Sequence, residues 1–257
     1  MRYVILSFDD GRRDFFTNAL PVLRKYQLKA TLNVVSDFVG HAGLSVFDSG
    51  NGECLSWEEI RICHDYGIEI ANHSADHTNE LPQILRGAQA IAREVGLTAP
   101  IGFASPSSDI FPGNFHAYRP LLENGDISYL RSGNQIKRDG YGYAALYFLY
   151  RFTGSAQLYC RYNRRNLIPL GSPCPLLPSV TCNADNNAKQ MLRFVQTIPD
   201  NTAVILMFHS ILKETDPGYS KDKWYNTVED FKALCAELSQ NQSLKVITTA
   251  ELTRLLK

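Results

Sequence analysis

Short apolar runs alternate with segments of helical periodicity along almost the whole chain, and this alternation limits the fold more than any other feature. The runs are apolar on both faces, which is typical of parallel strands covered by helices on both sides. Strands are expected at residues 3–8, 30–35, 68–73, 101–105, 127–132, 166–171, 203–209 and 244–249. Helices are expected at 15–26, 56–67, 81–96, 187–198 and 228–240. The pattern predicts an α/β fold, a distorted (β/α) barrel of seven to eight parallel strands.

The length of the chain agrees with this fold. A chain of 257 residues is normal for one α/β barrel, so we expect a single catalytic domain over residues 1–257. An open doubly wound sheet is the main alternative, but no Gly-x-Gly-x-x-Gly follows the first strand. The segment from Lys137 to Cys182 is the least regular, and we interpret it as an insertion at one rim, with its aromatic run packed inside.

Charge and cysteine content exclude several classes of protein. Lys plus Arg number 26 and Asp plus Glu number 26, so no basic excess favours nucleic acid or an anionic membrane as a partner. A neutral small molecule or oligosaccharide is the expected substrate, and the oligomeric state is not predicted. The six cysteines lack Cys-x-x-Cys spacing and are expected to be reduced thiols. No signal peptide precedes the first strand, so a cytoplasmic location is expected unless a leader has been removed.

Polar residues that could carry chemistry follow three of the expected strands. Asp9 and Asp10 follow the first strand, His73 and His77 the third, and His209 the seventh. In barrels, active sites are built at this carboxyl end of the strands. Two histidines and one carboxylate form a metal site with open positions, and a divalent cation would also relieve the repulsion between two adjacent aspartates. The sequence therefore predicts a metal site there, with zinc first and cobalt, iron or nickel as alternatives.

The chain resembles the polysaccharide deacetylases of carbohydrate esterase family 4. The resemblance is carried by "SFDDG" at the start, "KATLNVV" on the second strand, "ANHSADH" after the third and "VILMFHS" near the end. It implies a metal-dependent hydrolase that removes N-acetyl groups from an amino sugar or an N-acetylglucosamine-containing saccharide. Carried over by position, it implies Asp10, His73 and His77 as metal ligands, Asp9 as general base and His209 as general acid.

The third motif departs from the family pattern. Many members carry an arginine there that braces the catalytic aspartate, whereas this chain reads "FASPSS" from Phe103, with Ala104 at the arginine position. The resemblance still assigns the backbone N–H of Ser107 to the oxyanion. Asp185 is the candidate to orient His209, and Trp224 or Tyr225 could form a platform for a sugar ring.

Three other functions compete with deacetylation. A related hydrolase could act on another linear amide or a cyclic ureide, and a non-catalytic relative could bind carbohydrate and keep its ion. An iron oxygenase uses a similar two-histidine, one-carboxylate set. The oxygenase is disfavoured because it would leave Asp9 and His209 without a role.

Overall fold

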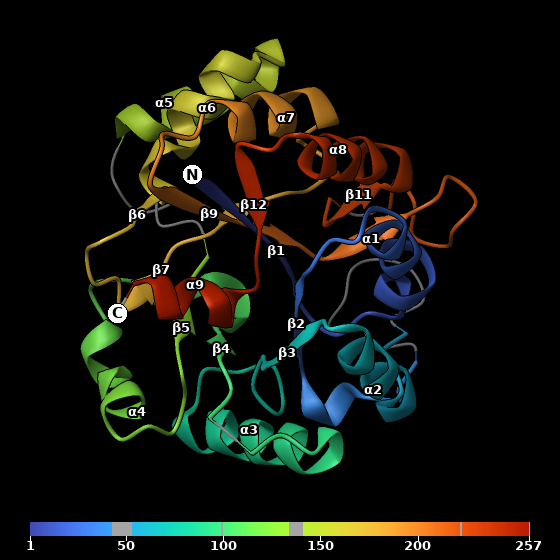
Figure 1. Cartoon of the computed structure of the whole chain (residues 1–257), viewed down its shortest axis with the longest axis vertical. Coiled ribbons are helices and arrows are strands. Elements are labelled where there is room, and N and C mark those ends of the chain that lie inside the picture. Colours follow the sequence, from blue (N-terminus) through green and yellow to red (C-terminus); the bar gives the residue numbers. More distant parts are fainter. Residues whose placement is uncertain (43–52, 99, 134–140, 222, 257) are drawn as a thin grey trace.

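The computed structural model describes residues 1–42, 53–98, 100–133, 141–221 and 223–256. The strands are β1 (Arg2–Phe8), β2 (Thr31–Val34), β3 (Glu69–Asn72), β4 (Phe103–Ala104), β5 (Leu130–Arg131), β6 (Ile168–Pro169), β7 (Leu176–Leu177), β8 (Val180–Thr181), β9 (Thr202–Phe208), β10 (Ser210–Leu212), β11 (Tyr225–Thr227) and β12 (Leu244–Val246). The main sheet runs in the order β6-β9-β1-β2-β3-β4-β5-β7, with β8 beside β9 and β12 beside β1. It curves into a nearly closed barrel surrounded by helices (Figure 1), which confirms the predicted fold class.

The barrel is built on the parallel pair β1 and β9. Their register runs from Arg2 opposite Thr202 to Phe8 opposite Phe208, and every residue of β9 is buried. Phe8 stacks on Phe208 with ring centroids 5.3 Å apart, so the strand ends are anchored in the core just before the chain turns into the site. On the other side, one extended segment closes the barrel, because β7 pairs with β5 and β8 pairs with β9.

Helices cover the outside of the barrel, and all five expected helices are found. The helices are η1 (Phe15–Ala19), α1 (Leu20–Tyr26), η2 (Ser36–Phe38), α2 (Trp57–Tyr66), α3 (Leu81–Val95), η3 (Pro106–Ser108), η4 (Phe115–Ala117), α4 (Arg119–Glu123), α5 (Tyr141–Thr153), α6 (Ala156–Asn163), η6 (Arg164–Asn166), α7 (Ala188–Gln196), α8 (Val228–Gln240) and α9 (Thr249–Leu255). Ser56 and Glu59 form a capping box at the start of α2. No helix in the described ranges is both long enough and apolar enough to span a bilayer.

The amino-end mouth of the barrel is covered by α9. Its first residues, Thr249 and Ala250, donate backbone N–H bonds to Thr31 and Glu69, the first residues of β2 and β3. The opposite mouth, at the carboxyl ends of the strands, is where the predicted site residues meet.

Two predictions about elements were wrong. The expected strand at 166–171 is only the two-residue β6, antiparallel to β9, because Pro169 has no N–H with which to continue a ladder. The region predicted to be irregular contains two helices, α5 and α6, which pack on each other, and α6 also packs on α7. Its aromatic run is packed on one side only, since Tyr150 lies with its ring centroid 5.2 Å from that of Tyr162, whereas Phe148 and Phe152 are exposed. All six cysteines are free, as expected.

Candidate active site and metal centre

Three predicted ligands come together at the carboxyl ends of β1 and β3. Asp10, His73 and His77 each offer one donor atom, and these atoms all lie within 4.8 Å of one another. Asp10 Oδ1 is 3.4 Å from His73 Nε2 and 3.3 Å from His77 Nε2. Ligand atoms held at about 2.0–2.1 Å around a tetrahedral cation are separated by about 3.3 Å. Asp10 Oδ1 is also buried without a hydrogen-bond partner among the described residues, so this donor set fits a divalent cation.

The two adjacent aspartates reach one site because the backbone turns sharply after β1. Successive side chains on a regular strand point to opposite faces. Here Asp10 has a φ of 76° and Gly11 a φ of 68°, so two consecutive residues adopt the left-handed conformation. Asp9 remains in the ladder, where its N–H donates to the carbonyl of Phe208 at 2.9 Å. The turn begins at Asp10 itself, one residue before Gly11.

The histidine motif bends as a loop. His73 still continues the ladder, since its N–H donates to the carbonyl of Val34 at 2.8 Å, but Ser74 and His77 have φ values of 64° and 65°. His73 Nδ1 lies 2.8 Å from the carbonyl oxygen of Ala104. That contact orients the ring and leaves Nε2 directed toward Asp10.

Helix α3 approaches the end of β3 closely, and a glycine permits it. A Cβ atom on Gly87 would lie 2.5 Å from Asn72 Oδ1 and 2.7 Å from the carbonyl carbon of Ser74. Asn72 in turn donates to the carbonyl of Ile84 on α3 at 2.8 Å. The strand end that carries His73 is therefore fixed against α3.

Asp9 is held by an arginine from β5. Arg131 Nη2 donates to both carboxylate oxygens of Asp9, at 2.8 Å and 2.7 Å, and Asn33 donates to one of them at 2.8 Å. Asp9 is 3% exposed and Arg131 1% exposed. Burial by itself would raise the pKa of Asp9, but Arg131, together with His73 and His209, lowers it below its ordinary value. Asp9 is therefore a carboxylate at neutral pH.

The third motif lacks an arginine, as the sequence shows, but Arg131 holds Asp9 from a different strand. Arg131 and Ala104 are register partners on β5 and β4, so their side chains lie side by side on one face of the sheet. The arginine absent from the third motif is thus supplied by the next strand, and the small side chain of Ala104 leaves room beside it. An arginine inside the expected apolar strand 127–132 was the signal that sequence reasoning missed.

Asp10 has an arginine of its own. Arg12 Nε donates to Asp10 Oδ2 at 2.8 Å, and Arg12 Nη1 donates to the hydroxyl of Ser210 at 3.0 Å. Burial opposes ionisation, but Arg12 and the nearby imidazoles of His73 and His77 hold the pKa of Asp10 well below its ordinary value. One oxygen of Asp10 therefore faces Arg12 while the other faces the histidines. Sequence reasoning did not single out Arg12.

His209 follows β9 directly and completes the group. Burial lowers the pKa of His209 to about 4, although the carboxylates of Asp10 and Asp9 act in the opposite direction. The ring of Trp224 lies with its centroid 5.0 Å from that of His209, next to the proposed acid. His209 Nδ1 is buried and has no hydrogen-bond partner in the described part of the chain. No hydrogen bond joins Asp185 to His209 within the described residues, and Asp185 forms an ion pair with Arg151 at 2.5 Å.

Ser107 lies in η3, directly after β4 and at the same end of the barrel. Its φ of 54° is left-handed, and its side chain is exposed. The location is compatible with the oxyanion role that the family resemblance implies. No contact of Ser107 with the ligand residues supports that role, which therefore stays a prediction.

Comparison with known proteins supports the resemblance. The polysaccharide deacetylase family model matches residues 1–101. YxkH of Bacillus subtilis, named as a candidate polysaccharide deacetylase, is 34% identical over 74 residues, which span 29% of this chain and 23% of that protein.

Two solved structures share the fold over nearly the whole chain. One is a protein of Mycobacterium smegmatis, also named as a candidate polysaccharide deacetylase, with a TM-score of 0.58, 15% identity, and coverage of 99% of this chain and 90% of that one. The other is the Xyl-CE4 domain of a multidomain xylanase from the hindgut metagenome of Trinervitermes trinervoides, with a TM-score of 0.51, 17% identity, and coverage of 98% and 89%. Residues 1–101 are therefore similar to the polysaccharide deacetylases, as the motifs in that part of the chain predict, and the chain as a whole shares the fold of the two solved structures.

Proposed function

We propose that the protein is a metal-dependent hydrolase that removes N-acetyl groups from an amino sugar or an N-acetylglucosamine-containing saccharide. The observation that carries the proposal is the placement of the Asp10, His73 and His77 donor atoms within 4.8 Å of one another, beside the ionised Asp9. Zinc suits two imidazoles and one carboxylate best, and cobalt, iron or nickel are the alternatives. The match to polysaccharide deacetylases supports the proposal that an N-acetyl amide is the bond that is cleaved.

Each residue of the site has a defined part in the proposed reaction. A divalent cation supplies Lewis acidity, since it acidifies water and polarises a carbonyl oxygen. Asp9 is the base that takes the proton of the attacking water, and Arg131 keeps this carboxylate ionised and oriented. The N–H of Ser107 is the proposed donor to the developing oxyanion.

His209 is the proposed acid, because an amide nitrogen leaves only when it is protonated. With a pKa of about 4, His209 is neutral at pH 7 and must receive a proton before it can give one. The field of Asp9 and Asp10 favours that protonated form. The products are acetate and a free amine, and one water is consumed.

Two further observations support the extent of the domain and the type of substrate. β12 near the end of the chain pairs with β1 at its start, which supports a single catalytic domain over residues 1–257. Trp224 beside His209 offers an aromatic face of the kind that packs on a sugar ring, and an uncharged saccharide suits a chain with no net charge.

The Asp9→Asn variant tests the assignment of the base. It keeps the shape of the side chain, so the cation and the fold should be retained, while acetate release from N-acetylglucosamine oligomers should fall by about 10²–10⁴-fold. Metal content and unfolding in urea, measured on the same samples, are the controls. Wild-type protein that carries its cation but releases no acetate would reject deacetylation of these oligomers. A fully active Asp9→Asn protein would reject Asp9 as the base.

A further inference from the structure

The helical hairpin of α5 and α6 exposes more apolar surface than its own packing requires. On the inner side of α5, Tyr147 and Tyr150 pack edge to face with ring centroids 5.4 Å apart. On the outer side, Phe148 is 68% exposed, Leu149 51% and Phe152 93%. Phe152 and Phe148 are the two most exposed large apolar side chains in the described part of the chain. A helix that is apolar on both sides is normally covered on both.

The exposed residues form one continuous stripe. Ala144, Phe148 and Phe152 are spaced four residues apart, and Ala145 and Leu149 lie alongside them, so all five share one face of α5. All five are exposed. The stripe is therefore an organised apolar surface and does not consist of scattered side chains.

A positively charged groove lies on the neighbouring helices. The groove, of about 700 Å³, runs between α6 and α7, with Leu158 and Phe194 among its apolar lining and Arg161, Arg164 and Arg193 as its charged groups. Within the described ranges, none of these three arginines has an ion pair or a hydrogen bond to an acidic side chain. The chain contains as many acidic as basic residues, so the positive charge of the groove results from the uneven distribution of charged residues over the surface.

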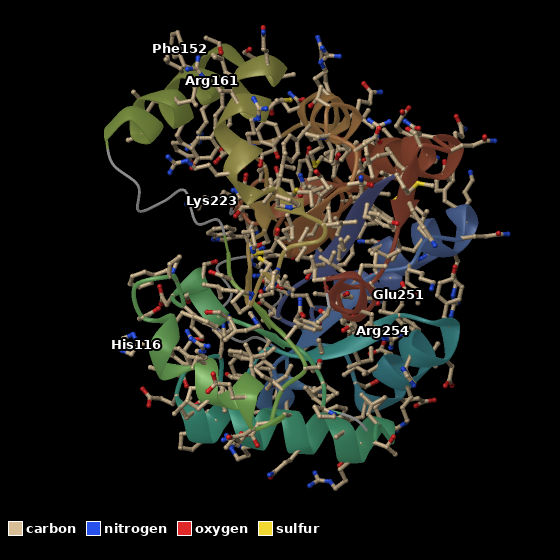
Figure 2. The ribbon with its side chains drawn as sticks, turned by 60° about the vertical axis from the view of Figure 1, so that its left-hand side comes forward. His116, Phe152, Arg161, Lys223, Glu251 and Arg254 are labelled. Carbon is tan, nitrogen blue, oxygen red and sulfur yellow. The ribbon has the colours of Figure 1, made fainter. Side chains whose placement is uncertain are left out.

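The stripe and the groove belong to one end of the molecule. α5 packs against α6 and α6 against α7, and Figure 2 shows Phe152 and Arg161 projecting outward together at that end. Exposed aromatic residues beside arginines are the composition of surfaces that lie in the membrane interface. A soluble anion would engage the arginines alone. A second copy in a symmetric dimer would cover the aromatics but bring like charges together.

We propose that this face, formed by the outer stripe of α5 and the arginine groove of α6 and α7, docks on an anionic phospholipid bilayer. The stripe enters the boundary between headgroups and acyl chains, and Arg161, Arg164 and Arg193 pair with lipid phosphates. The inference is independent of the proposed deacetylation. It revises the expectation that the protein has no membrane partner. That expectation was based on the total charge of the chain, which does not describe how the charges are distributed over the surface.

Flotation of the whole protein with vesicles tests the proposal. Vesicles of phosphatidylcholine alone are compared with vesicles in which about a third of the lipid is phosphatidylglycerol. We expect binding to the anionic vesicles and much weaker binding to the neutral ones. Binding should weaken as NaCl is raised, because the Debye length falls from about 10 Å at 0.1 M to about 3 Å at 1 M.

Matched substitutions on two faces locate the binding surface. Phe152→Ser should weaken vesicle binding by about tenfold or more, and Arg161→Gln by about fivefold. The controls are Leu255→Ser and Arg254→Gln on α9, where Leu255 is 45% exposed and Arg254 is also exposed. Figure 2 shows Arg254 far from Phe152 and Arg161, so these controls make the same chemical changes elsewhere.

Three results would overturn the proposal. The first is no binding to anionic vesicles at low salt. The second is equal weakening by the α9 variants, which would mean a nonspecific effect of charge or hydrophobicity. The third is a dimer in sedimentation velocity that Phe152→Ser abolishes while vesicles bind neither protein, since the face would then be an interface between two copies.

Discussion

The strand-end site and the α5–α6 face use the same residue types in opposite ways. In the site, two buried arginines are each matched to a carboxylate, Arg131 to Asp9 and Arg12 to Asp10. On the hairpin face, arginines line an open groove without acidic partners among the residues that the structure describes, and aromatic side chains are exposed. A buried charged side chain needs a partner of opposite charge, because a desolvated charge without a partner costs several kcal/mol. At the surface no such constraint acts, so the unmatched groups are available to something outside the chain.

Within the site, the two neighbouring aspartates differ in how many of their carboxylate oxygens have a hydrogen-bond partner. Both oxygens of Asp9 accept hydrogen bonds from Arg131. Asp10 gives one oxygen to Arg12 and leaves the other, Oδ1, without a hydrogen-bond partner among the described residues, beside two imidazoles. The first arrangement suits a positioned base, and the second suits a metal ligand.

Removing the arginine that pairs with Asp9 should have a large effect on stability. Arg131→Met leaves a buried carboxylate alone, so we expect a loss of about 3–5 kcal/mol in unfolding free energy at neutral pH, measured by urea denaturation. The pKa of Asp9 should rise, since its main cationic partner is gone. Asp9 then binds its proton more readily, and the deficit relative to wild type should shrink as the pH falls.

A double variant provides the control for this prediction. Asp9→Asn with Arg131→Met removes both charges and should recover part of the lost stability at neutral pH. A single Arg131→Met protein as stable as wild type at every pH would mean that the ion pair does not hold Asp9.

Asp14 shows the effect of burial on a carboxylate near the site that lacks its own arginine. Its pKa is raised to about 6 by burial, although the N–H of Ile211, Arg12 and Ser210 act in the opposite direction. Because the folded pKa lies above the ordinary 3.8, the group stabilises the fold below pH 3.8 and loses that contribution as the pH rises through 6.

The Asp14→Asn variant isolates this contribution. Its unfolding free energy relative to wild type should increase by about 2–3 kcal/mol between pH 4 and pH 7. Urea denaturation at both pH values measures the change. If the difference in unfolding free energy between the variant and wild type stays constant with pH, then Asp14 has an ordinary pKa.

The smallest effect is expected on the hairpin face. Phe152→Ser should change the unfolding free energy by no more than about 0.5 kcal/mol, because the side chain is 93% exposed. Phe194→Ala, at a residue only 2% exposed beneath the groove, should cost about 3–5 kcal/mol. Equal losses of unfolding free energy in Phe152→Ser and Phe194→Ala would contradict the view that Phe152 contacts an external partner and not the protein core.

The barrel and the positions of Asp9, Asp10, His73 and His77 could be predicted because they follow from local patterns. Apolar runs mark the strands, and the motifs follow their carboxyl ends. The contact of Arg131 with Asp9 could not be predicted, because it depends on the register between β4 and β5.

The α5–α6 hairpin was missed for a different reason. Helices are recognised by one apolar side and one polar side, and α5 is apolar on both. The candidate Asp185 forms no hydrogen bond with His209 among the described residues and pairs with Arg151. Pairings between distant residues are set by packing, and a linear pattern does not contain them.

Metal content measured by mass spectrometry on wild-type protein and on His73→Ala tests the central claim most directly. We expect about one divalent ion per chain in wild type and almost none in the variant. We also expect acetate release from N-acetylglucosamine oligomers that follows the ion across both samples. A wild-type protein without an ion even after reconstitution, or a variant that retains it fully, would contradict the assignment of Asp10, His73 and His77 as a metal centre.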